Sequence, residues 1–236
     1  MAIDDLPMPV VTFLNVIGVQ WPYINEDSLI DFGNLVSEFG QAVEQTHQDA
    51  TATITQLGSV YKGAAYTQLH TRWTQMSTSH VNDIVEACQV VSAACQAAAA
   101  YIVVQKGEAI VELIALAAAF IAAQAAAVET LGLSEAGAVL ADEAAERLVE
   151  SLEQDLEQYL IGKLAGEALK PLIAKVESAM AGLDWPGGAG PGSTEATFEA
   201  DTAKMMTHSG TLHSHADTIA GHTQTFAAKA STIHIG

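Results

Sequence analysis

The chain has 236 residues, and its 9 lysines and arginines against 28 aspartates and glutamates give a formal net charge of −19. This balance excludes nucleic-acid binding by phosphate neutralisation and disfavours attraction to anionic lipid, because both need a basic surface. Half of the residues are apolar but only 6% are aromatic, and the excess is alanine, the strongest helix former.

These features predict an all-α fold, a long antiparallel helical hairpin extended into a helical bundle, followed by a heptad-patterned C-terminal helix. No proline lies between Pro22 and Pro171, and a sandwich or barrel would need frequent turn residues in such a stretch.

Residues 1–22 are predicted to form an irregular leader that ends at Trp21-Pro22. The N-terminus is acidic and lacks the basic region and cleavage site of a secretory signal peptide. We therefore expect a protein that is cytoplasmic or leaves the cell by a route without a cleaved leader.

Residues 23–107 are predicted to form the hairpin. The first helix begins near residues 25–28, where polar caps and acids suit a helix N-terminus, and carries an apolar stripe of Leu29, Phe32, Val36, Phe39 and Val43. The segment Ser59-Val60-Tyr61-Lys62-Gly63 interrupts the pattern, and glycine there accepts backbone conformations that a side chain would penalise. The second helix then presents Tyr66, Leu69, Trp73 and Met76 on one face and shows no break before Gly107.

The two cysteines, Cys88 and Cys95, lie seven residues apart on this second helix. That spacing separates them by about 10.5 Å along the axis, too far for a disulfide within one helix. They are interpreted as small core residues, or as partners in a disulfide across a symmetric dimer.

Residues 108–182 are predicted to be an alanine-rich helical extension. The segment from Ala109 through Phe120 to Val128 is almost wholly apolar and long enough to span a bilayer, but Glu112 interrupts it and no basic cluster flanks it. Two interpretations remain open, a buried bundle helix and a membrane-active segment.

Residues 183–195 are a Gly/Pro-rich linker, and residues 196–236 carry a large apolar residue at every seventh position, an interaction seam formed by Phe198, Met205, Leu212, Ile219, Phe226 and Ile233. The residues four positions later are small: Thr202, Ser209, Ala216, Thr223 and Ala230. A large-and-small seam over five heptads predicts helix–helix packing, either on the main bundle or with another chain.

His208, His215 and His222 are also heptad-spaced, beside this seam. They are interpreted as polar flanking residues or as a pH-responsive strip, because protonation below about pH 6.5 would add positive charge at a packed interface. Metal binding is disfavoured, since the same spacing holds ligands about 10.5 Å apart.

The sequence offers no nucleophile–base pair, phosphate-binding glycine loop or Cys-x-x-Cys motif. The many carboxylates are expected on solvated helix faces, without a pocket to separate their pKa values. We therefore expect no enzymatic activity, no cofactor and no metal.

The hairpin resembles the WXG family of type VII (ESX) secretion substrates, whose turn carries Trp-x-Gly. The matching residues are Tyr61-Lys62-Gly63, with tyrosine in place of tryptophan, followed by Ala64-Ala65-Tyr66 and Trp73. Together with Trp21-Pro22 and the alanine-rich stretch, the pattern looks like the WXG-like N-terminal domains of actinobacterial channel-forming and polymorphic toxins.

The resemblance implies signal-peptide-independent export by type VII secretion machinery, to the medium or cell envelope, and pairing with a helical partner or with further copies of the chain. The family's export motif, Tyr-x-x-x-Asp/Glu, is matched only by Tyr23 and Asp27, ahead of the first helix rather than after the second. The function expected is helix–helix interaction and assembly. The alternatives are a membrane-active or pore-forming protein that uses residues 109–128, and an adaptor for a separate toxin.

Overall fold

The computed structural model describes residues 6–77, 81–129, 135–181 and 199–235, and the described chain is almost entirely helical, as predicted. It divides into two compact units, each made of segments that are distant in sequence. Unit 1 combines residues 1–31, 94–166 and 234–236, and unit 2 combines residues 32–93 and 167–233. Each unit is described separately below.

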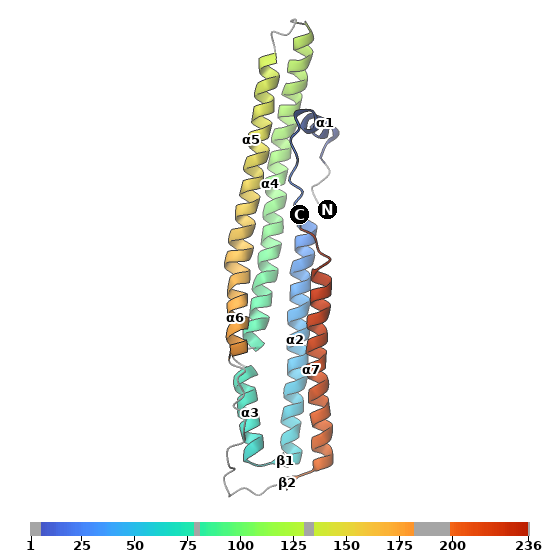
Figure 1. Ribbon diagram of the computed structural model, residues 1–236, viewed down its shortest axis with the longest axis vertical. Helices are drawn as coiled ribbons and strands as arrows, with labels where there is room; N and C mark the ends of the chain where they lie inside the picture. The colour runs from blue at the N-terminus through green and yellow to red at the C-terminus, as the bar shows by residue number, and fades with distance from the viewer. Residues whose placement is uncertain (1–5, 78–80, 130–134, 182–198, 236) are drawn as a thin grey trace. The chain divides into compact units, whose positions relative to one another are not determined.

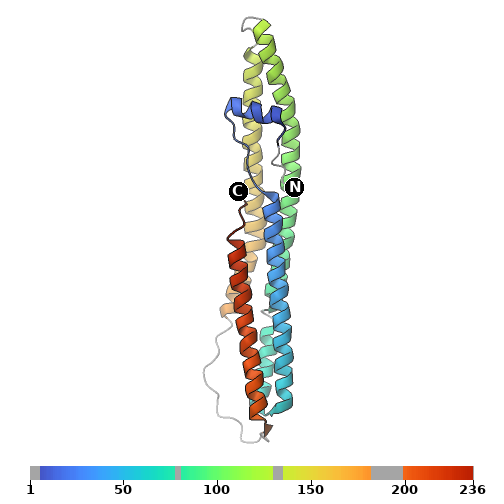
Figure 2. The same cartoon turned by 90° about the vertical axis from the view of Figure 1, so that its right-hand side faces the viewer.

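Unit 1 is built on an antiparallel pair of helices, the later part of α4 (Asn82–Glu129) and α5 (Glu135–Leu160). Helix α5 continues as a π-helical segment, Ile161–Leu169. Both views show the two helices side by side (Figures 1 and 2). The buried residues of both helices are alanines and branched side chains: Ala98, Ile102, Ala109, Leu113 and Ala117 on α4, and Ala141, Ala145, Val149, Leu152 and Leu156 on α5. Small residues thus let the two backbones pack closely.

A short helix, α1 (Met8–Ile17), also belongs to unit 1. The prediction of an irregular leader was therefore wrong. Its prolines occupy the start of the helix, where the missing N–H costs nothing. Phe13 is buried, and its ring lies 5.1 Å from that of Phe120 on α4. Gly18 ends the helix in the left-handed conformation, with φ of 77°, as glycine commonly does at a C-cap.

Unit 2 is organised around α2, which spans Glu26–Val60 and contributes residues 32–60 to this unit. Helix α7 (Thr202–Ala230) runs antiparallel beside it (Figures 1 and 2). The other elements are α3 (Ala64–Met76), the first turns of α4, α6 (Lys170–Ala181), and two short strands, β1 (Tyr61–Lys62) and β2 (Glu199–Ala200). Lys175 of α6 lies 3.6 Å from Asp83 and 3.5 Å from Glu86 on α4.

The predicted second helix of the hairpin corresponds to α3 and α4, and residues 78–80 between them lie outside the described residues. Helix α3 ends at Met76, and α4 starts at Asn82. Helix α4 then runs without a break through Gly107, where the predicted hairpin ended, to Glu129. The predicted linker, residues 183–195, lies outside the described residues.

Two glycines allow close helix packing inside unit 2. A β-carbon on Gly40 of α2 would lie 2.9 Å from Cβ of Cys88 on α4, and one on Gly58 would clash with the Tyr66 hydroxyl on α3. Contacts below 3.0 Å force a neighbour to move. Both cysteines are buried and free, as their interpretation as core residues predicts, and burial raises the pKa of the Cys95 thiol to about 11.

The Gly40 contact predicts that Gly40→Ala destabilises the protein although alanine favours helix. Cβ of Cys88 is fixed by its backbone, so α2 and α4 must separate, and overpacking of this kind costs about 1–3 kcal/mol. The control is Gly221→Ala on α7, where a β-carbon meets nothing within 4 Å, and there we expect a gain of about 0.5–1 kcal/mol. Urea unfolding of both variants measures the difference, and equal effects would contradict the close approach.

Candidate helix-interaction site

The turn between α2 and α3 is an extended corner held by the segment that precedes α7. Tyr61 and Lys62 pair antiparallel with Ala200 and Glu199, and the Asp201 N–H donates to the carbonyl oxygen of Val60 at 2.9 Å. Gly63 has φ of 155° and ψ of 170°, a region that essentially only glycine occupies. The requirement for glycine at this turn is thus visible in the backbone.

Two aromatic residues predicted for the turn motif, Tyr66 and Trp73, face α2. Tyr66 packs against Gly58. The Trp73 indole N–H donates to the Thr51 hydroxyl at 2.9 Å, and the indole stacks on the His47 ring, with centroids 5.0 Å apart. Tyr61 lies in β1, and Trp21 is buried in unit 1.

The apolar seam of α7 packs against α2. Its members in the described chain are all half-buried: Met205, Leu212, Ile219, Phe226 and Ile233. The Phe226 ring lies 5.0 Å from Phe39 and 6.4 Å from Phe32. Phe198, the first predicted member, lies outside the described residues.

The second row of the seam differs from the prediction. The row four residues after each large residue is exposed, apart from Ala230, which is half-buried. The half-buried row lies three residues after each large residue instead, and consists of His208, His215 and His222. The prediction that small residues complete the seam was therefore wrong, and the histidines lie within it.

Two of these histidines bond to threonines of α2. His222 Nε2 lies 3.1 Å from the Thr46 hydroxyl, and His215 Nε2 lies 3.3 Å from the Thr53 hydroxyl. The two histidines are seven residues apart on α7, and the two threonines are seven residues apart on α2. Both bonds therefore fit the same antiparallel register of the two helices. Lys229, one heptad beyond His222, lies 3.9 Å from Glu38 and extends the row with an exposed ion pair.

The hydrogen-bonding direction in these pairs follows from the threonines. The Thr46 hydroxyl donates to the carbonyl oxygen of Ala42, and the Thr53 hydroxyl donates to that of Asp49. A hydroxyl has one hydrogen to give, so each threonine oxygen accepts from Nε2–H of its histidine.

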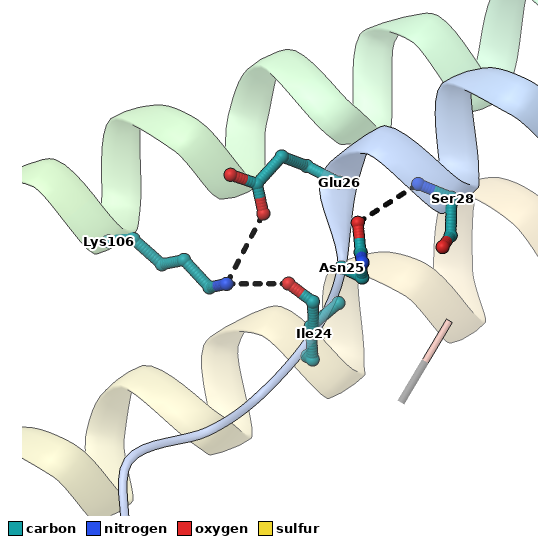
Figure 3. Close-up of polar contacts among 5 residues, drawn as sticks. All are labelled: Ile24, Asn25, Glu26, Ser28 and Lys106. Atoms are coloured by element: carbon teal, nitrogen blue, oxygen red, sulfur yellow. Dashed lines mark hydrogen bonds and ion pairs between the residues drawn. The ribbon is translucent and has the colours of Figure 1, made fainter. Parts of the chain in front are cut away.

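A buried ion pair joins α4 to the start of α2 within unit 1 (Figure 3). Lys106 and Glu26 are 0% and 1% exposed, and Lys106 Nζ lies 3.3 Å from the carboxylate. Nζ also donates to the carbonyl oxygen of Ile24, while the Asn25 side chain accepts from the Ser28 N–H at 3.0 Å. The predicted polar cap of α2 is thus confirmed.

The apolar stretch of α4 is packed on one face only. Ala109 is buried and Phe120 is half-buried against Phe13, whereas Glu112 is exposed; nothing is described of the Val128 side chain. By length and composition α4 is the one helix of the described chain that could cross a membrane, and 17% of its most apolar window is buried. Within the described residues, no group of three or more His, Cys, Asp or Glu could hold a metal ion.

The fold and the corner at Gly63 agree with the comparison with known families. A model described as a WXG100-like domain matches residues 5–148, more than half of the chain. The chain belongs to this WXG100-like family. It is therefore a helical protein associated with type VII secretion. No curated protein and no solved structure matches it.

The family match covers α1 to α4 and the first half of α5, and it ends before α7. The heptad helix α7 thus lies outside the WXG100-like region, whereas the α2 residues that it contacts lie within that region. Tyr101 and Tyr159, whose spacing to the following acids does not fit the export motif, stack on each other between α4 and α5 with centroids 3.9 Å apart. Tyr23, the tyrosine that does fit, is 67% exposed.

Sequence reasoning missed a cluster at the end of α3. His47 Nε2 lies 2.5 Å from the Ser77 hydroxyl, and the same ring stacks on Trp73. Burial lowers the pKa of His47 below its ordinary value, so the ring is held neutral against α3. Thirty residues separate His47 from Ser77, and no local spacing could indicate the contact.

The lowered pKa of His47 predicts acid sensitivity. The unfolded chain takes up this proton near pH 6.5 and the folded chain only at lower pH, so the contribution of His47 to stability is complete above pH 6.5 and decreases below it. Urea midpoints at pH 8 and pH 5.5 should differ less in His47→Gln than in wild type. His213→Gln, an exposed position on α7, should behave as wild type. Equal pH dependence in all three proteins would contradict this role.

Proposed function

We propose that this chain is a non-enzymatic, type VII secretion-associated protein that acts by helix–helix assembly. The observation that carries the proposal is the WXG100-like match over residues 5–148, with Tyr61-Lys62-Gly63 at the turn of the hairpin. The glycine backbone at Gly63 and the packing of Tyr66 and Trp73 on α2 support the interpretation of this turn as the family's motif.

Assembly is the second part of the proposal. It is supported by one helix face that is already paired and by another that is exposed. Helix α7 pairs with α2 inside the chain, while Val104, Val111, Ile114 and Ile121 of α4 are 46–68% exposed. The partners proposed are a helical protein, or further copies of the chain, and the secretion machinery. The route would take the chain from the cytoplasm to the medium or cell envelope.

Secretion of a tagged full chain from cells with and without a working type VII system tests the proposal. We expect the tag in the medium only when the system works, and a tagged cytoplasmic protein should stay inside both strains. Gly63→Val, which strains the turn, should reduce export, whereas Gly221→Ala should not. Export that is equal in both strains would refute the proposal.

Membrane association is the second candidate function, because α4 is long and apolar enough to cross a bilayer and little of its apolar window is buried. Pore formation would be a special case of it. Flotation with lipid vesicles at neutral and acidic pH tests this candidate, and a chain that stays unbound at both pH values removes it.

A further inference from the structure

Helix α4 carries a second apolar stripe that the described part of the chain leaves exposed. Its positions follow a heptad pattern and consist of Ala97, Ala100, Val104, Gly107, Val111, Ile114, Ala118, Ile121 and Ala125. All are exposed except Gly107, which is half-buried. None is charged or polar. We call this set the α4 stripe, and all of it belongs to unit 1.

The α4 stripe lies opposite the face that packs inside unit 1. Val111 follows the buried Ile102 by nine residues, which is two and a half turns and therefore half a turn around the helix. Val111 is 68% exposed and Ile102 is 0% exposed. From Ala97 to Ala125 the stripe is about 42 Å long at 1.5 Å per residue. Four heptads of this pattern are enough to specify pairing with another helix.

The charges beside the α4 stripe distinguish among three candidate occupants: a second copy of the chain, a bilayer and a helix of another protein. Glu108 and Glu112 are exposed and flank its midpoint at Val111. An antiparallel second copy centred on the stripe would bring these carboxylates of both chains together, and like charges at an interface disfavour pairing. A bilayer would have to accept the same two carboxylates in its interior. A helix with lysine or arginine beside its seam would pair with them.

We propose that the α4 stripe is the docking surface for a helix of another protein, one with an apolar heptad seam flanked by basic residues. The inference rests on the assembly role proposed above and specifies its partner. The alanines and Gly107 leave room for the large side chains of the partner, and the carboxylates select its charge. Flanking charges set partner choice in paired helices in this way.

The test uses the full chain and three synthetic helices five heptads long. They share one leucine–alanine seam and carry lysine, glutamine or glutamate at the flanking positions. Fluorescence anisotropy should show the lysine helix binding about tenfold more tightly than the glutamate helix, the effect of a few exposed charge pairs. Glu108→Gln with Glu112→Gln should abolish the preference for lysine over glutamine.

The matched control concerns exposed apolar residues elsewhere in unit 1. Val111→Gln with Ile114→Gln should abolish binding, whereas Val139→Gln with Leu140→Gln should not, although Val139 and Leu140 on α5 are also 53% and 67% exposed. Circular dichroism confirms that each variant is folded. Equal binding by both double variants, or equal binding of the three helices, would overturn the inference.

Two further outcomes would identify another occupant and also overturn it. Self-association of the wild type that Val111→Gln with Ile114→Gln abolishes would assign the stripe to a second copy. Flotation with phosphatidylcholine vesicles that depends on the same residues would assign it to a bilayer. Export that requires the type VII system, together with a stripe that binds no helix, would overturn only this inference. Binding without export would overturn only the proposed secretion role.

Discussion

Unit 2 depends on the two faces of α2, because every other element of that unit packs against this helix or against a neighbour of it. One face is the buried stripe that includes Val36, Val43 and Ile54. It approaches α4 closely enough at Gly40 to exclude even a methyl group. The other face is the heptad row through Phe39, Thr46 and Thr53, which receives α7. Helix α2 can pack against two neighbours in this way because a glycine keeps its contact with α4 close, while its phenylalanines face α7.

Unit 1 combines close helix packing through small residues with a buried ion pair. Removing Lys106 and Glu26 from water costs several kcal/mol, so such a pair contributes more to a defined arrangement than to stability. Here Lys106 bonds both the first residue of α2 and the carbonyl oxygen of Ile24. A shift of α4 along its axis would leave an unpaired buried charge. The polar seam of α7 acts similarly in unit 2, because both histidine–threonine bonds form together in only one register.

Much of the fold was predictable because the buried face of a helix appears in the sequence as apolar residues spaced three and four positions apart. The stripe of α2 follows from three- and four-residue spacing, and the cap at Asn25 and the glycine at the turn follow from residue type. Helix α1 was missed because prolines at its start resemble an irregular segment. The prediction of the seam was half wrong. Small residues and histidines both recur every seven residues, and the sequence does not distinguish a row three residues after each large residue from a row four residues after it. Contacts such as Lys106 with Glu26 depend on tertiary distance and have no local pattern.

The packing of α7 on α2 is tested most directly by a double-mutant cycle on Thr53 and His215, measured by urea unfolding at neutral pH. Thr53→Val keeps the shape of its side chain, His215→Phe keeps an aromatic ring, and each removes the hydrogen bond. We predict a coupling energy of about 0.5–1.5 kcal/mol, the usual contribution of one hydrogen bond. The control cycle pairs Thr53→Val with His213→Phe, whose position is exposed, and should give no coupling. Zero coupling between Thr53 and His215 would contradict the register, and with it the role of the histidines in the seam.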